Sequence, residues 1–135
     1  MQAKAFMEDV RNAEAEIRRL SDQKTHLYEL ATSISPNWSG DRVQTTVSSK
    51  VENSAAKIVD LTRELDLQIG LYVDKVRRAN DLISKIPQEK FRRVLTMYYI
   101  LGWNTATIRT ALGYTDDKSA YRCREYALRE LQRLL

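Results

Sequence analysis

Cysteine, proline and glycine are scarce in this sequence of 135 residues, which holds one, two and four of them respectively. A single cysteine, Cys123, cannot form an internal disulfide and cannot build a cysteine-rich zinc site. No run of about 18 apolar residues is present, which excludes a membrane-spanning helix of the usual kind. No charged-then-apolar segment of the signal-peptide type is present at the N-terminal end, so we expect a cytoplasmic protein.

Signatures of catalysis are missing as well. The sequence has no glycine-rich phosphate loop and no cluster of residues with metal-ligand spacing. Its only histidine, His26, has no second histidine or cysteine nearby and no nucleophile beside it. The sequence therefore predicts a binding protein rather than an enzyme, with no catalytic residue, no cofactor and no metal ion.

The scarcity of helix-breaking residues favours long helices, and two stretches carry the matching pattern. Apolar residues from Phe6 to Ile34 recur in alternating steps of four and three, which is a heptad seam. This pattern predicts a helix over residues 3–34 that stops ahead of Pro36. A second seam predicts a helix over residues 50–86. The seam positions are Phe6, Val10, Ala13, Ile17, Leu20, Lys24, Leu27, Ala31 and Ile34 in the first helix, and Val51, Ala55, Ile58, Thr62, Leu65, Ile69, Tyr72, Val76, Ala79, Ile83 and Ile86 in the second.

Residues 35–49 separate the two seams and have no sustained period, so a loop is predicted there. Trp38 in this loop either anchors a partner or folds over the neighbouring helix ends. Two seams of matching length joined by a loop favour an antiparallel helical hairpin. Because each helix has only one narrow apolar stripe, the hairpin has a thin core. That core favours self-association into a homo-oligomer or the binding of another protein.

The remainder of the chain is predicted to form three shorter helices. Pro87 suits the first turn of a helix, and Gly102 supplies a left-handed cap at its end. Asn104 is a suitable N-cap for a short helix that ends at Leu112, ahead of a second left-handed cap at Gly113. The apolar positions are Phe91, Val94, Leu95, Tyr98 and Tyr99 in the first of these helices, and Ile108 and Leu112 in the second.

The last helix follows a short turn and can be capped by Thr115, Asp116 or Asp117. The two aspartates suit the positive end of its dipole better than they suit a metal ion. Its apolar stripe comprises Ala120, Cys123, Ala127, Leu128, Leu131 and Leu135. The predicted fold class is all-α: a long antiparallel helical hairpin, a coiled-coil arm, over residues 1–86, followed by a C-terminal three-helix helix-turn-helix domain over residues 87–135.

Basic residues outnumber acidic ones only in the C-terminal third. Residues 1–86 hold 13 of each kind, whereas residues 87–135 hold 9 basic and 5 acidic residues. The net charge of +4 therefore lies wholly on the predicted helix-turn-helix. This asymmetry indicates an anionic partner or, as the plainer alternative, a solvated helical surface that happens to be basic.

A helix-turn-helix places the N-terminal part of its second helix in the major groove of DNA. Arg122 is the leading candidate there, because arginine reads guanine with two hydrogen bonds. The candidate base readers are Lys118, Ser119, Tyr121, Arg122 and Glu125, and the candidate phosphate contacts are Lys90, Arg92, Arg93, Thr105, Thr107, Arg109 and Thr115. Arg124 and Arg129 are predicted to pair with Glu125 and Glu130 or with helix-end carbonyls, outside the site.

Residues 98–131 resemble region four of bacterial sigma factors, through Ile108, the Leu112-Gly113-Tyr114 run and the Ala127-Leu128 pair. The upstream heptad helix, the segment Ser39 to Gln44 and the AKIVDL segment at residues 56–61 extend the likeness over nearly the whole chain. Together they resemble a family of bacteriophage late-gene transcription regulators of the ArpU/RinA type.

The resemblance implies a phage or prophage regulator that binds double-stranded DNA near a promoter, in the cytoplasm of a bacterial host. It further implies that such a protein helps host RNA polymerase to transcribe late genes. Two alternatives stay open. One is a DNA-packaging recognition subunit of the small-terminase type, which also joins a helix-turn-helix to coiled helices. The other is a coiled-coil adaptor that binds only protein.

Overall fold

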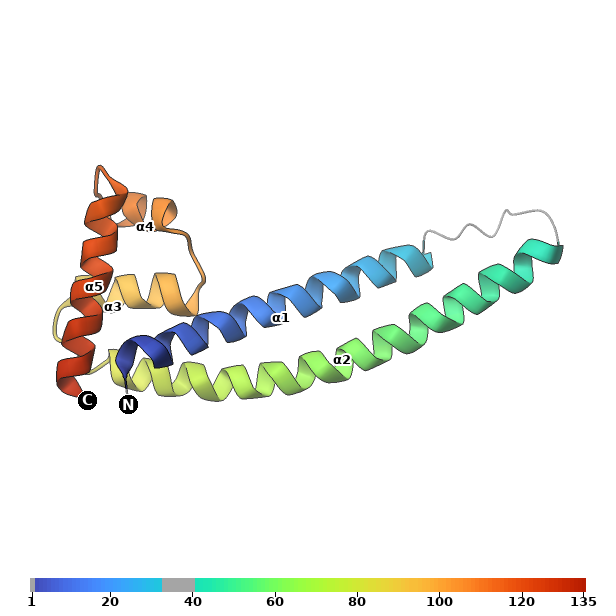
Figure 1. Cartoon of the computed structure of the whole chain (residues 1–135), viewed down its shortest axis with the longest axis horizontal. Coiled ribbons are helices and arrows are strands. Elements are labelled where there is room, and N and C mark those ends of the chain that lie inside the picture. The colour runs from blue at the N-terminus through green and yellow to red at the C-terminus, as the bar shows by residue number, and fades with distance from the viewer. Residues whose placement is uncertain (1, 33–40) are drawn as a thin grey trace. The chain divides into compact units, whose positions relative to one another are not determined.

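The computed structural model describes residues 2–32 and 41–135, with side chains from residue 52 onward in the second segment. The described residues form helices and no strand, which confirms the all-α class (Figure 1). The elements are α1 (Ala3–Thr32), α2 (Asp41–Ile83), α3 (Glu89–Leu95), the π-helix η1 (Thr96–Ile100), α4 (Thr105–Leu112) and α5 (Asp117–Leu134). Trp38 and the rest of the segment 33–40 lie outside the described residues.

Helix α2 begins at Asp41, so the prediction of a loop over residues 41–49 is wrong. The sequence after Gly40 contains no glycine until Gly70 and no proline until Pro87, so nothing in it stops a helix. The missing heptad pattern indicates only that this part of the helix lacks a regular apolar stripe. The helix ends at Ile83, and the chain then turns with the backbone N–H of Ile86 donating to the carbonyl of Ile83 at 3.0 Å.

The chain divides into two compact units, and the division differs from the predicted boundary at residues 86 and 87. One unit comprises residues 1–15 and 70–135, and the other comprises residues 16–69. Residues 87–135 therefore pack together with the start of α1 and the end of α2. The heptad pattern did not predict this division into two units, because the heptads of both helices continue without a break across residues 15 and 70.

The unit of residues 1–15 and 70–135 has one continuous apolar core. Met7 and Val10 of α1 are fully buried, and so is Ala79 of α2. They share the core with Leu95 and Leu131, and α5 packs against both α3 and α4. An ion pair between Lys75 and Asp9 (3.0 Å) joins α2 to α1 at the edge of this core.

In the unit of residues 16–69, Leu20 and Leu65 are the buried hydrophobic side chains among those described. The first seam is borne out, since its described members are all buried or half-buried. The second seam is wrong at two positions, because Ala55 is exposed and Ile69 is 43% exposed. After Leu65, the buried or half-buried positions on this face are Gln68 and Tyr72. The spacing is therefore three residues and then four, whereas the predicted seam through Ile69 has four and then three.

The helix predicted after Pro87 is not uniform, because a π-helical turn follows α3. The N–H of Leu101 donates to the carbonyl of Thr96 at 2.9 Å, which spans five residues rather than four. The wider turn buries Met97 as well as Tyr99. Burial raises the pKa of Tyr99 to about 12. The apolar periodicity predicted that Tyr99 faces the core but did not predict this for Met97, because a prediction from periodicity assumes the regular α-helical pitch.

Candidate nucleic-acid interface

Helix α4 is capped at both ends by the residues that the sequence indicates. The Asn104 side-chain oxygen accepts a hydrogen bond from the backbone N–H of Thr107 at 2.8 Å. At the other end Gly113 is left-handed, with φ of 76°. Ile108 is buried and Leu112 is half-buried, so the predicted inner face is confirmed. Left-handed Gly102, with φ of 72°, likewise lies at the predicted end of the preceding helix.

Asp116 is the residue that caps α5. Its Oδ1 accepts from the backbone N–H of Ser119 at 2.8 Å. Hydrogen bonds from the Ser119 side chain and backbone, with the nearby charges of Arg122 and Lys118, lower the pKa of Asp116. Asp117 lies in the first turn, where its Oδ1 is 3.7 Å from Nε of Arg109. This ion pair joins α4 to α5 across the turn.

The inner stripe of α5 is confirmed except at its end. Ala120, Cys123, Ala127, Leu128 and Leu131 are buried. Leu135 is 45% exposed, so its prediction as a stripe residue is wrong. The helix ends at Leu134, which is half-buried against the core instead. Burial also raises the pKa of the Cys123 thiol, as fits a small core residue.

The candidate base readers lie on or beside the outer face of α5. Lys118, Tyr121 and Arg122 are exposed, whereas Ser119 and Glu125 are half-buried. At 3.6 residues per turn, positions 118, 122, 125 and 129 fall within an arc of about 60°. This line of four residues is called the outer line of α5 below. It begins in the first turn of the helix and lies opposite the buried stripe.

Arg129 belongs to this outer line and, among the described residues, forms neither of the predicted contacts, a salt bridge with Glu125 or Glu130 or a hydrogen bond with a helix-end carbonyl. Glu130 pairs with Arg133 instead. Arg129 lies with its guanidinium carbon 5.6 Å from the centre of the Tyr126 ring. Sequence reasoning excluded it because Glu125 and Glu130 are close in sequence. The angle of each residue around the helix axis, which follows from 3.6 residues per turn, was the signal that could have placed Arg129 on the same side of α5 as Arg122.

Several candidate phosphate contacts also hold the helices together. Arg92 donates to the carbonyls of Ile86 (2.7 Å) and Pro87 (2.9 Å), which fixes the turn between α2 and α3. Arg93 donates to the carbonyl of Ala111 at 3.4 Å and so joins α3 to α4. Because Arg92 is also half-buried, it is the least available of these cations for a ligand.

The remaining candidates lie around the α4–α5 turn. Lys90 has its ammonium 4.3 Å from the centre of the Tyr114 ring, and a hydrogen bond with Tyr114 raises the pKa of this lysine. Arg109 is the partner of Asp117 described above. Thr105 is half-buried in the first turn of α4, whereas Thr107 and Thr115 are exposed. Neither Lys90 nor Arg109 was predicted to have a structural partner.

Tyr98 joins three elements through its ring, which the sequence did not indicate. The guanidinium carbons of Arg11 and Arg124 each lie 3.8 Å from the ring centre. Arg11 also donates to the backbone carbonyl of Tyr98. Arg124 was predicted to pair with a glutamate or a helix end, and it stacks on aromatic rings instead, including that of Tyr121 at 5.0 Å.

Within residues 2–32 and 41–135, no group of three or more histidine, cysteine, aspartate or glutamate side chains is placed to hold a metal ion. No helix in the same part of the chain is long and apolar enough to cross a membrane.

Comparison with known proteins identifies one family. No curated protein and no solved structure matches the chain. A family model described as a protein of unknown function, DUF1492, matches residues 32–132. The match includes α2 through most of α5 and covers well over half of the sequence, and the chain therefore belongs to the DUF1492 family.

Proposed function

We propose that this protein is a sequence-specific regulator of transcription that binds double-stranded DNA through α4 and α5. The observation that carries the proposal is the outer line of α5. Lys118, Arg122 and Arg129 are exposed there, and none of them forms a salt bridge with a described carboxylate. A helix that presents unpaired cations opposite its buried stripe suits an electronegative groove.

The arrangement of α4 and α5 supports the same proposal. The short helix α4, the left-handed Gly113 and the Asp116 cap lead into a longer helix, which is the order of a helix-turn-helix. In this motif the first turns of the second helix face the base edges. Arg122 is then the principal reader of guanine, with Lys118, Ser119, Tyr121 and Glu125 around it. Lys90, Arg93 and Arg109 border the turn and suit phosphate contacts.

The likeness to phage late-gene regulators makes the proposal more specific. The protein activates late genes of a phage or prophage together with host RNA polymerase, in the bacterial cytoplasm, and it works without catalysis, cofactor or metal ion. This part rests on the sequence motifs quoted above. Genome-wide footprinting in the host tests it, because one peak ahead of a late operon is expected.

The direct test of DNA recognition is the substitution Arg122→Ala. Binding to the preferred duplex, found by selection from random sequences, is expected to weaken by about 1–3 kcal/mol with relaxed preference at one base pair. Arg63→Ala, at an exposed position of α2, is the matched control and leaves binding unchanged. If Arg122→Ala weakens preferred and random duplexes equally, Arg122 is not a base reader.

A protein-binding role for the long helices has its own support. In the unit of residues 16–69, Val59, Leu67 and Ile69 are large apolar side chains with 43 to 58% exposure. Exposed apolar side chains gathered on one element favour a protein partner, here a second copy of the chain. Light scattering tests this, and a large ring would favour the packaging-subunit alternative. If the protein binds no DNA even at about 50 mM salt, where electrostatic binding is strong, the adaptor alternative replaces the proposal.

A further inference from the structure

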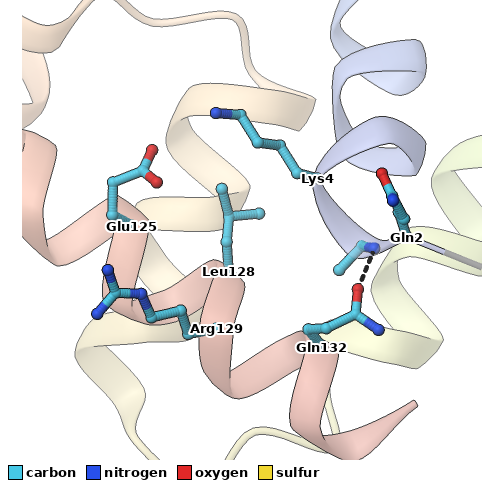
Figure 2. A pocket seen from close by; sticks show the side chains of 7 residues that line it. Gln2, Lys4, Glu125, Leu128, Arg129 and Gln132 are labelled. Atoms are coloured by element: carbon cyan, nitrogen blue, oxygen red, sulfur yellow. Dashed lines mark hydrogen bonds between the residues drawn. The ribbon is translucent and has the colours of Figure 1, made fainter.

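A pocket of about 440 Å³ lies between the start of α1 and the second half of α5. All of its lining residues belong to the unit of residues 1–15 and 70–135. Leu128, which is 5% exposed, is one of the lining residues. Figure 2 shows the charged ends of Lys4, Glu125 and Arg129 on one side of Leu128 and the amides of Gln2 and Gln132 on the other.

The two walls of this pocket are fixed to each other. The side-chain oxygen of Gln132 accepts a hydrogen bond from the backbone N–H of Ala3 at 2.7 Å, drawn as a dashed line in Figure 2. Ala3 itself is 1% exposed and belongs to the core. Lys4, the next residue, is therefore held beside α5 rather than carried on a free end.

The charges of the pocket are unbalanced in favour of cations. Lys4 and Arg129 are exposed and form no salt bridge with any described carboxylate, and Glu125 is the one acidic residue of the lining. Glu125 lies one turn closer to Arg122 along the outer line of α5. The Lys4 and Arg129 end of the pocket thus carries two positive charges and the negative charge of Glu125, a net charge of +1.

The outer line of α5 places this pocket relative to a DNA groove. Arg129 follows Arg122 by seven residues, which is about 10 Å along a helix at 1.5 Å per residue. Since the N-terminal turns of a recognition helix face the base edges, Arg129 lies beyond those turns, on the part of α5 that is left to contact the sugar-phosphate backbone.

We propose that Lys4 and Arg129 together hold one phosphodiester of the DNA backbone beside the groove that α5 enters. The inference rests on the proposed function and extends it, because it makes the first turn of α1 part of the DNA interface. Lys4 lies in the segment whose charges balance to zero, and for that reason the charge distribution along the sequence gave it no role.

The test uses the full chain, a fluorescein-labelled duplex selected for binding and a shuffled duplex of equal length. Binding of Lys4→Gln, Arg129→Gln and the double variant is measured by anisotropy between about 50 and 200 mM salt, the range over which phosphate contacts change affinity strongly. Lys85→Gln is the matched control, since Lys85 is exposed in the same unit and lies outside the pocket. Far-ultraviolet circular dichroism checks that each variant keeps its helices.

The proposal expects both single variants to weaken binding to the two duplexes by the same factor and to lower the salt slope by about one. The charge-conserving Lys4→Arg keeps the wild-type slope, and Lys85→Gln behaves as wild type. If the double variant keeps wild-type affinity and slope while Arg122→Ala relaxes sequence preference, the phosphate site is wrong and the proposed function stands. If the wild-type protein binds neither duplex, both are wrong.

Discussion

The backbone N–H of Ala3 donates to the side chain of Gln132, 129 residues later in the chain, at 2.7 Å. The first N–H groups of a helix have no partner within the helix, so Gln132 satisfies one donor at the start of α1 from α5. Together with buried Met7 and Val10, this bond makes the N-terminal turns of α1 a component of the C-terminal core.

Gln132→Ala is expected to lower the free energy of unfolding by about 1 kcal/mol, because it removes the partner of a helix-terminal N–H. Urea unfolding followed by circular dichroism measures the change. Gln68→Ala is the control, since Gln68 bonds only to Glu64 within α2 among the contacts described and should change little. Equal effects of the two substitutions would mean that the Ala3 contact adds no stability.

Met7→Ala is expected to cost about 2–5 kcal/mol, because Met7 is fully buried and its truncation leaves a cavity. Leu30→Ala, at a position 48% exposed on the same helix, serves as the control and should cost far less. The same unfolding experiment distinguishes them. A small effect of Met7→Ala would show that α1 does not share the core with α5.

Gly113→Ala and Gly70→Ala are expected to act in opposite directions. An added Cβ meets nothing within 4 Å at either position, so only the backbone decides. At Gly113, with φ of 76°, alanine costs about 1–2 kcal/mol, the penalty of a left-handed residue with a side chain. Inside α2, alanine at position 70 stabilises by about 1 kcal/mol. Thermal unfolding of the two variants checks the signs.

Asp116→Asn is expected to remove part of the pH dependence of stability. The folded-state pKa of Asp116 lies below the usual 3.8, so the charged cap stabilises the protein above that pH and loses its effect as the pH falls through the lowered value. Asparagine also caps a helix but does not titrate. The melting temperature of the wild-type protein should therefore exceed that of the variant by a larger margin at pH 7 than at pH 3. An equal difference at the two pH values would indicate that folding does not change the pKa of Asp116.

The sequence predicted the elements whose signals are local. Asn104 and Gly113 are identifiable as caps because the side chain or backbone preference of a single residue decides each helix end. For α5 the sequence left Thr115, Asp116 and Asp117 as alternatives, of which Asp116 is the cap. The buried stripe of α5 is identifiable because its residues recur at the helical period. These features position the candidate base readers, and they needed no knowledge of distant contacts.

Other features depended on contacts between residues far apart in sequence. The packing of α1 on α5 involves no local pattern, so the predicted domain boundary omitted it. The π-turn at Thr96 changed which side of the helix is buried and thereby added Met97 to the core. Arg129 was expected to have a partner within its own helix because Glu125 and Glu130 are close to it in sequence. Its angle around the helix axis instead places it on the outer line of α5. Arg124 was expected to pair with a glutamate or a helix-end carbonyl, but it lies over the ring of Tyr98, as does Arg11.

The burial of Cys123 has a practical consequence for studying the protein. It is the only cysteine in the sequence, it is 4% exposed, and its pKa is raised by burial. A buried thiol of this kind reacts slowly with alkylating reagents. A cysteine introduced at one exposed position therefore takes up a maleimide dye selectively in the folded protein, and the native core residue need not be replaced.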